Sequence, residues 1–356
     1  MKILHVCGKK DWGGGENQLL LIIDEIAKDI DKIEQFLLCP LNSDISKKII
    51  DNNVNINIFT AKKQANLDPR FIYSIYRVVK NNGITIIHVH DPDAHSLVVL
   101  AIDIFRLKTK VILHKKTIFP IKDKKYSFYK YNHKNIKHII CVSEASKKSI
   151  ENKIKSIPIS VVYDAIKLNT NLSKNKSSEN FTILNVANHT RHKNLFTLLA
   201  VANECINIRN LPFKFVQIGH GKLTDELFSK KSELGLDSNF EFKGFINDVN
   251  SYYSTSDAFL FTSVREGLGV SLLEAIQYKL PIISSNAGGI PEVIENKKEG
   301  LTCDFDDVNS YANNLEMIYN SEELTQQLTE NAFVKIKEKF STESMIQKLK
   351  SIYYSI

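Results

Sequence analysis

Short runs of apolar and β-branched residues alternate with amphipathic stretches along almost the whole chain. The runs predict strands, and the stretches between them, with apolar residues three and four positions apart, predict helices. In the first half, the predicted strands are Lys2–Val6, Gln35–Leu38, Asn55–Phe59, Thr85–Val89, Lys110–Leu113 and His138–Val142. The predicted helices lie near Glu16–Asp29, Ser43–Asp51, Arg70–Asn81, Ala94–Phe105 and Glu144–Asn152. This alternation is typical of a parallel sheet with helices on both faces.

The alternation pauses once and then resumes. Residues 169–180 are almost entirely polar, as in a surface linker. After them, the predicted strands are Phe181–Val186, Lys214–Ile218, Phe240–Phe242, Ala258–Thr262 and Pro281–Ser284, and the last predicted helices are Val308–Ile318, Glu322–Phe340 and Ser344–Tyr354. We therefore predict an α/β protein with two doubly wound, Rossmann-like domains that face each other across a cleft. The domains span residues 1–168 and 181–340, and a C-terminal helix within residues 341–356 is expected to pack back on the first domain.

The composition fits such a fold and argues against other classes of protein. Of the 356 residues, 43% are hydrophobic and 24% are charged, which is average for soluble domains and unlike a disordered chain or a membrane bundle. The longest apolar run, Leu97–Ile104, contains Asp103 and is too short to span a bilayer. The five cysteines are scattered and form no C-x-x-C pair, so neither a disulfide framework nor a zinc site is expected. The expected location is the reducing cytoplasm.

The net charge of +7 is concentrated in the first half of the chain. Residues 1–160 carry 27 basic and 16 acidic side chains, whereas the remainder carries 20 and 24. Eleven basic residues and one acid lie between Arg106 and Lys137, with aromatic residues among them. Such a segment can contact anionic lipid headgroups, bind phosphate groups or nucleic acid, or simply form a solvated basic face. We expect this segment to form a surface that contacts a membrane or the acceptor, and we expect no binding of nucleic acid. The basic residues of this surface are Lys115, Lys116, Lys122, Lys124 and Lys125.

Two carboxylates flank a glycine-containing loop in the second half. Glu266 follows the predicted strand Ala258–Thr262, and Glu274 comes eight residues later on a predicted helix. Two carboxylates at the mouth of one cleft can hold two sets of hydroxyls, such as those of a sugar and a ribose. Backbone N–H groups at the start of the helix favour an anion such as a diphosphate. The loop residues expected to contact the ligand are Glu266, Gly267, Leu268, Gly269 and Val270.

These motifs resemble those of the retaining, nucleotide-sugar-dependent glycosyltransferases of family 4, which have the GT-B fold. The family's E-x7-E signature matches Glu266 and Glu274, and its S-N-x-G-G-x-P-E segment matches Ser285–Glu292. The resemblance covers essentially the whole chain in a shared order. Further matching segments are Trp12–Glu16, His88–Asp91, Cys141–Ala145, Gln217–Gly221 and Phe242–Phe245.

The resemblance implies transfer of a hexose-type sugar from a nucleotide diphosphate sugar to an acceptor hydroxyl, with retention of anomeric configuration. Glu274 would hold the ribose and Glu266 the sugar, while Lys193 would bind the diphosphate. The family's arginine aligns with Asn188, so Arg191 is expected to supply the second cation. Since these cations can neutralise the leaving group, no metal or other cofactor is expected. The other donor-binding residues implied are Gly14, Gly15, Gly219, Gly244 and Phe245.

The first domain would bind the acceptor, a glycan or lipid-linked molecule of cell-envelope polysaccharide biosynthesis. His114 matches the family's cleft histidine and, with Glu266 and Lys193, would be catalytic; Glu16 and His90 would face the acceptor. Peripheral association with the inner face of the cytoplasmic membrane is expected. A D-x-D pattern at Asp91–Asp93 could hold a metal in a different transferase architecture, but its position in the first domain argues against that use.

Two alternatives remain open from the sequence. A non-hydrolysing sugar-nucleotide epimerase would share the two-domain architecture and would release an epimerised donor without an acceptor. A basic module that binds nucleic acid or a membrane would show salt-dependent affinity and no binding of nucleotide sugars.

Overall fold

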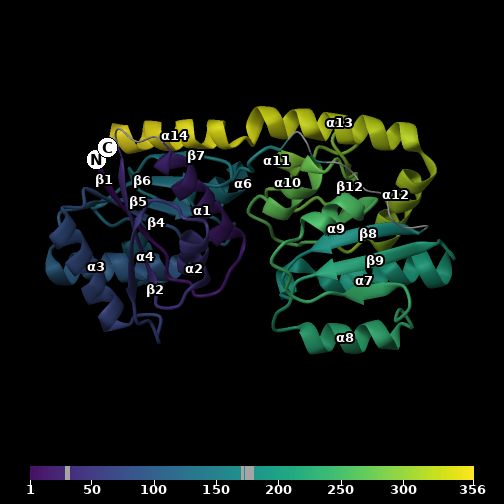
Figure 1. Cartoon of the computed structure of the whole chain (residues 1–356), viewed down its shortest axis with the longest axis horizontal. Coiled ribbons are helices and arrows are strands. Elements are labelled where there is room, and N and C mark those ends of the chain that lie inside the picture. Colours follow the sequence, from purple (N-terminus) through teal and green to yellow (C-terminus); the bar gives the residue numbers. More distant parts are fainter. Residues whose placement is uncertain (29–32, 170–171, 173–179) are drawn as a thin grey trace. The chain divides into compact units, whose positions relative to one another are not determined.

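The structure, a computed structural model, describes residues 1–28, 33–169, 172 and 180–356. It contains two compact units (Figure 1). Unit 1 comprises Met1–Ala165 together with Thr342–Ile356, and unit 2 comprises Ile166–Ser341. The predicted linker at residues 169–180 lies mostly outside the described residues.

Unit 1 is built on a parallel sheet of seven strands in the order β3-β2-β1-β4-β5-β6-β7. The order reverses between β1 and β4, and in such sheets ligands bind at the carboxyl ends of the strands beside this switch point. The strands are β1 (Lys2–Val6), β2 (Glu34–Pro40), β3 (Asn57–Ala61), β4 (Ile86–Val89), β5 (Lys110–Lys115), β6 (Ile136–Cys141) and β7 (Ile159–Val161). The α-helices are α1 (Gly14–Ala27), α2 (Asp44–Asp51), α3 (Pro69–Asn82), α4 (Pro92–Phe105), α5 (Lys125–Tyr131), α6 (Glu144–Lys148) and α14 (Thr342–Ser355).

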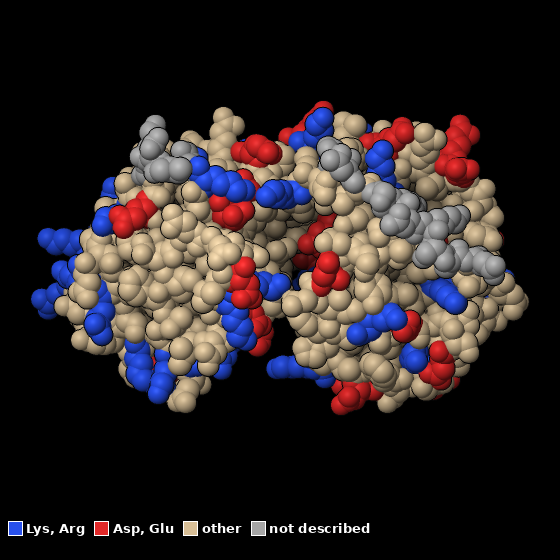
Figure 2. Space-filling model, in the orientation of Figure 1, with Lys and Arg blue, Asp and Glu red and all other residues tan. Residues whose placement is uncertain are grey.

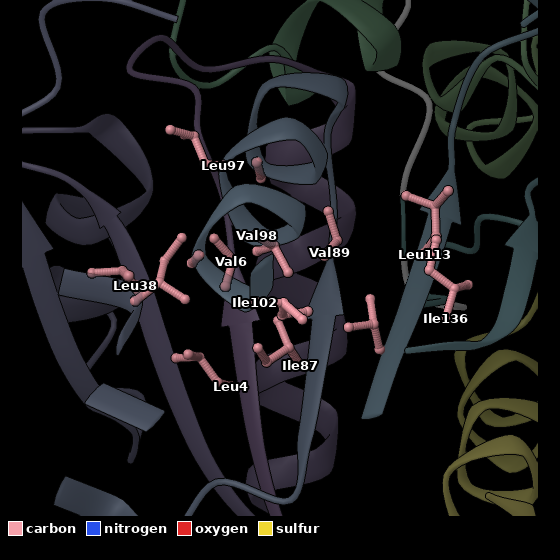
Figure 3. Close-up of a cluster of buried hydrophobic side chains, with 14 of the residues drawn as sticks. Leu4, Val6, Leu38, Ile87, Val89, Leu97, Val98, Ile102, Leu113 and Ile136 are labelled. Atoms are coloured by element: carbon pink, nitrogen blue, oxygen red, sulfur yellow. The ribbon is translucent and has the colours of Figure 1, made fainter. Parts of the chain in front are cut away.

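The two faces of this sheet carry separate hydrophobic clusters. One face packs against α4, where Leu97, Val98 and Ile102 contact the strands (Figure 3). On the other face, residues such as Ile3 and Ile86 pack with α1 and α14, and Tyr353 of α14 is fully buried there. The last helix of the chain therefore completes the core of unit 1.

Unit 2 repeats the same topology in a parallel sheet of six strands, ordered β10-β9-β8-β11-β12-β13. Its switch point lies between β8 and β11. The strands are β8 (Phe181–Val186), β9 (Phe213–Ile218), β10 (Phe240–Phe242), β11 (Ala258–Phe261), β12 (Ile282–Ser285) and β13 (Leu301–Cys303). The α-helices are α7 (Leu195–Asn203), α8 (Thr224–Glu233), α9 (Asn250–Thr255), α10 (Val270–Gln277), α11 (Ile290–Val293), α12 (Val308–Asn320) and α13 (Glu322–Lys339).

The predicted fold class of two doubly wound α/β domains is confirmed, with local differences. The predicted strand Asn55–Phe59 lies two residues later, as β3, and the predicted helix Glu144–Asn152 ends at Lys148 before a short 3-10 turn. The short elements β7, β13 and α5 have too few residues for a recognisable period. In the described part of the chain, no helix combines the length and apolarity that crossing a bilayer requires.

Candidate functional site

The loops at the switch point of unit 2 bring a lysine and a glutamate together. Lys193 follows β8, in a 3-10 turn of residues Arg191–Lys193, and Glu266 follows β11. The Lys193 ammonium forms an ion pair and hydrogen bond with Glu266 Oε2. Both side chains remain partly exposed, at 20% and 15%. An incoming ligand can therefore reach both charges.

Backbone contacts between these two loops set the position of Lys193. The Val264 N–H donates to the His192 carbonyl over 2.9 Å, and the Thr262 hydroxyl donates to the Lys193 carbonyl over 3.1 Å. The Lys193 ammonium also lies 5.2 Å from the centre of the Phe261 ring, within the range of a cation–π contact. The lysine is thus held over the end of β11.

Helix α10 begins at Val270, four residues after Glu266. Gly269 precedes its first residue with φ of +102°, a left-handed conformation that glycine adopts readily. In the part of unit 2 that the structure describes, no side chain caps this helix. The Gly289 N–H donates to the Glu266 carbonyl over 3.0 Å and connects the loop after β12 to it. Leu268 is buried, so only its backbone can contribute to anion binding.

Glu274 lies on α10, half-buried beside Tyr253 of α9. The Tyr253 hydroxyl donates to Glu274 Oε2 over 3.0 Å. Burial raises the pKa of Glu274 to about 7, although the hydrogen bond from Tyr253 opposes this shift. The carboxyl therefore changes charge near neutral pH, and only its ionised form is purely a hydrogen-bond acceptor. Tyr253 was missed in the sequence because it lies 21 residues away.

The predicted Gly219 lies where β8 and β9 approach closely. A Cβ at Gly219 would lie 2.1 Å from the Ala187 oxygen, and its φ of +138° also favours glycine. The Gly219 N–H donates to the Gly244 carbonyl over 2.8 Å, which joins the ends of β9 and β10. Phe245, next to Gly244, is 54% exposed.

A buried polar network supports these strand ends and was missed by sequence reasoning. Gln217 Oε1 lies 2.8 Å from His189 Nε2, and the Gln217 amide donates to the Ala187 carbonyl over 2.8 Å. His189 Nδ1 in turn lies 2.8 Å from the Thr224 hydroxyl. A polar residue within a predicted strand, such as Gln217, is the sequence signal that could have indicated this network.

Arg191 and Asn188, the two candidates for the second cation position, are both exposed. Arg191 begins the turn that carries Lys193, and its side chain forms no ion pair with any residue that the structure describes. The substitution of Arg191 for the family's arginine stays a prediction.

The glycine-rich loop of unit 1 lies at the first switch point, between β1 and α1. The Lys116 ammonium donates to the Gly15 carbonyl over 2.6 Å, so the first turn of α1 is connected to the end of β5. Gly14 is the first residue of α1. Glu16, in the first turn, is 5% exposed, and burial raises its pKa while Lys9 and Lys116 oppose the shift.

Four histidines are buried near the same strand ends. The predicted residues His90 and His114 are joined by His88, which belongs to the matched segment His88–Asp91, and by His5, which the sequence did not single out. The His88 and His114 rings are stacked with centroids 5.3 Å apart. Burial lowers the pKa of His114 well below its usual value, and Lys116 adds to the effect. These imidazoles are therefore neutral at pH 7.

The predicted basic surface is only partly a surface. Lys122, Lys124 and Lys125 are exposed, around the start of α5. Lys115 is 6% exposed, and its ammonium donates to the carbonyls of Thr117 and Phe119, so its prediction as a surface residue is wrong. On the face in Figure 2, basic side chains gather at the end of unit 1 that bears α3, whereas both signs are mixed over unit 2.

An open pocket of about 570 Å³ lies elsewhere in unit 2. Asn286, Cys303, Asp304 and Asp307 are among its lining residues, and none of the predicted donor-binding residues lines it. The pocket is a separate feature from the Lys193–Glu266 pair.

The predicted residues thus form two groups, one in each unit. In unit 2, Lys193 and Glu266 are in direct contact, while Glu274 lies farther along α10 with Tyr253. In unit 1, Gly15 is in contact with Lys116, and His90 and His114 have ring centroids 5.8 Å apart.

Comparisons with known proteins assign both halves of the chain to glycosyltransferase families. Residues 12–170 match the family model "Glycosyltransferase Family 4", and residues 169–335 match "Glycosyl transferases group 1". The chain is 28% identical to an uncharacterized glycosyltransferase of Haemophilus influenzae over 60% of each chain. It is also 28% identical to the UDP-Gal:alpha-D-GlcNAc-diphosphoundecaprenol alpha-1,3-galactosyltransferase of Escherichia coli, over 39% of this chain and 36% of that protein. The chain therefore spans less than two thirds of either relative.

A solved structure extends the similarity to the whole fold. The crystal structure of Anabaena HepE in complex with UDP and glucose superposes with a TM-score of 0.85, covering 100% of both chains at 17% identity. At this identity the likeness concerns the fold alone, which is the predicted GT-B fold.

Proposed function

The chain belongs to the family 4-type glycosyltransferases, and from this premise we propose that it transfers a hexose-type sugar from a nucleotide diphosphate sugar to an acceptor hydroxyl. The donor binds in unit 2 and the acceptor in unit 1. Anomeric configuration is retained. The acceptor is a glycan or a lipid-linked glycan of the cell envelope, and the name of the Escherichia coli relative, which specifies a diphosphoundecaprenol acceptor, supports this class.

The observation that carries the proposal is the Lys193–Glu266 pair at the switch point of unit 2, next to the start of α10. In open α/β sheets, ligands bind at this position. A lysine stabilises negative charge on a departing diphosphate, and the adjacent helix N-terminus adds the partial positive charge of its N–H groups. Glu266, once a diphosphate occupies Lys193, is available to sugar hydroxyls.

The remaining groups have supporting roles in the proposed reaction. Ionised Glu274 accepts hydrogen bonds from the ribose hydroxyls, and Arg191 adds a second cation. The transition state resembles an oxocarbenium ion, with negative charge growing on the departing phosphate. The leaving phosphate itself takes the proton of the attacking hydroxyl on the front face of the sugar. Because protein cations neutralise the diphosphate, the transfer needs no metal.

Thermal stabilisation by a panel of nucleoside diphosphates and nucleotide sugars tests this proposal. A ligand at 100 times its Kd stabilises the folded state by roughly 2.7 kcal/mol, which a melting experiment detects. Glu274→Ala should abolish most of the rise in melting temperature that the ligand causes. The control Glu295→Ala, which changes a side chain that is 63% exposed, should keep that rise. The proposal fails if no nucleotide in the panel stabilises the wild-type chain.

We also propose that unit 1 associates peripherally with anionic membranes through the start of α5. Lys122, Lys124 and Lys125 are exposed there, and the nearby Phe119 and Phe128 are 43% and 38% exposed. Basic side chains near an anionic surface contribute about 1 kcal/mol each.

Vesicle sedimentation tests the membrane proposal. Changing Lys122, Lys124 and Lys125 to Glu should reduce binding to phosphatidylglycerol vesicles. The matched control changes the exposed Lys222, Lys337 and Lys339 of unit 2 to Glu, which alters the net charge equally. Equal loss of binding in both triple variants would contradict a specific surface at α5.

A further inference from the structure

Three buried histidines of unit 1 converge beside the switch point of its sheet. His5 lies on β1 and pairs in register with His88 on β4, so their side chains point to the same face. His90 lies two residues after His88 and returns to that face. His5 and His88 are fully buried, and His90 is 4% exposed. One ring nitrogen from each residue lies within 4.8 Å of those of the other two.

The contacts of Gln35 fix the tautomer of His5. The Gln35 amide group donates to the Ile23 carbonyl over 3.0 Å, so its oxygen is the atom that lies 3.2 Å from His5 Nε2. An amide oxygen can only accept, and His5 therefore carries its proton on Nε2. Its Nδ1 keeps a lone pair and lies 2.9 Å from His90 Nε2.

Outer contacts also orient His88. Its Nδ1 lies 2.7 Å from the Tyr353 hydroxyl of α14. Its Nε2 is buried and has no hydrogen-bond partner among the residues that the structure describes, and the same is true of His90 Nδ1. A buried polar atom without a partner costs about 1–3 kcal/mol, so the unpartnered His88 Nε2 favours an occupant that bonds to this nitrogen.

We propose that His5, His88 and His90 bind a divalent transition-metal ion of the zinc type. The ligand atoms are His5 Nδ1, His88 Nε2 and His90 Nε2. Two imidazole nitrogens on a tetrahedral zinc lie about 3.3 Å apart, given bonds of roughly 2.0–2.1 Å. The 2.9 Å separation of His5 Nδ1 and His90 Nε2 is close to that value. His88 Nε2 must move toward these two nitrogens, which lie within 4.8 Å of it.

Binding requires no net release of a proton. His90 moves its proton from Nε2 to Nδ1 and stays neutral, and His5 already carries its proton on Nε2. His88 binds the ion through Nε2 as the tautomer whose Nδ1–H donates to the Tyr353 hydroxyl. Gln35 and Tyr353 act as the outer partners that orient metal-bound imidazoles.

The proposed ion has a structural role that is separate from the sugar transfer. It connects β1 to the end of β4 and, through Tyr353, to the helix that closes the core of unit 1. The inference therefore does not depend on the proposed enzymatic activity.

Metal titration of the full-length, untagged chain tests the proposal. After chelator treatment, the protein is dialysed against Co²⁺ or Zn²⁺, and bound metal per chain is measured by atomic emission. We expect one ion per chain, visible Co²⁺ absorption bands and a higher melting temperature with Zn²⁺. His90→Asn should lower the affinity at least 100-fold, and Tyr353→Phe roughly 10-fold.

The matched control is His138→Asn, because His138 is a buried histidine on β6 that lies outside this group and bonds to Ser160. It should bind metal as the wild type does. The proposal is wrong if the wild-type chain holds no stoichiometric ion, or if Tyr353→Phe and His90→Asn bind as tightly as the wild type. If His90→Asn does not fold, Tyr353→Phe alone decides, because it removes a single hydroxyl.

Discussion

Units 1 and 2 place side chains at equivalent positions of the same strand order, yet the chemistry of the two positions differs. In unit 1, the ends of β1 and β4 carry neutral, fully buried histidines. In unit 2, the loops after β8 and β11 carry a partly exposed ion pair between Lys193 and Glu266. The shared topology gathers side chains at the switch point, and the identity and exposure of those side chains decide what they can bind.

Because of this difference in charge and exposure, the two positions suit different kinds of ligand. Partly exposed opposite charges suit a ligand that is itself an anion with hydroxyl groups, because the ligand can replace each partner of the ion pair. Buried neutral imidazoles suit a hydroxyl or a metal ion, because they offer lone pairs without charge. Each of the following experiments changes one side of the comparison.

The largest effect is expected from Lys193→Ala. Removing a cation that stabilises leaving-group charge should lower the turnover of the best donor by about 10²–10³-fold, measured as nucleotide release. Lys230→Ala is the control, because Lys230 is a partly exposed lysine of unit 2 that pairs with Glu233. If both variants retain wild-type turnover, Lys193 has no catalytic role.

Gly219→Ala should destabilise unit 2 by more than about 2 kcal/mol, measured by urea unfolding. The added Cβ would lie 2.1 Å from the Ala187 oxygen, and φ is +138°. Gly235→Ala is the control in the same unit, since Gly235 has a φ of +66° and no atom within 4 Å of the added Cβ. It should cost only about 1 kcal/mol. Equal losses would show that the close approach at Gly219 is unimportant.

Stability and donor affinity should depend on the ionisation of Glu274 in opposite directions. Its folded pKa of about 7 lies above the ordinary value of 4.5, so its contribution to stability is full below about pH 4.5 and is lost as the pH rises to about 7. The Glu274→Gln variant has no carboxyl to titrate at this position. The difference between its free energy of unfolding and that of the wild type should therefore rise by on the order of 1–2 kcal/mol between pH 5 and pH 8.

Donor affinity should instead increase as the pH rises through about 7, because the ribose hydroxyls donate to the ionised carboxyl. Calorimetry from pH 6 to pH 8 measures both variants. A wild-type affinity with the same pH dependence as that of Glu274→Gln would contradict the assigned role.

The smallest effect is expected from Lys116→Met in unit 1. This change removes the hydrogen bond to the Gly15 carbonyl but keeps most of the apolar side-chain volume. We expect the free energy of unfolding to fall by about 1 kcal/mol and the amides at the start of α1 to exchange faster, measured by hydrogen–deuterium exchange. Lys108→Met, at an exposed residue of the same unit, should leave the exchange unchanged.

Sequence motifs were informative where neighbouring residues make the site. The segment from Glu266 to Glu274 spans one loop and the helix after it, so its spacing could be recognised directly. The partners of these residues could not, because they come from other elements. Tyr253 reaches Glu274 from α9, and the Lys115 ammonium turns inward to the carbonyls of its own loop. The donor roles of Glu266, Glu274 and Lys193 stay predictions.

The amino-acid sequence by itself determined the alternation of strands and helices, the two halves of the chain and the family, because these depend on local periodicity and on residues close together along the chain. Only the tertiary structure decided which distant residues meet. His88 contacts Tyr353 across 265 positions of sequence, and His5 reaches both Gln35 and His90. Strand register and helix packing bring such residues together, and their burial then sets which of them are charged.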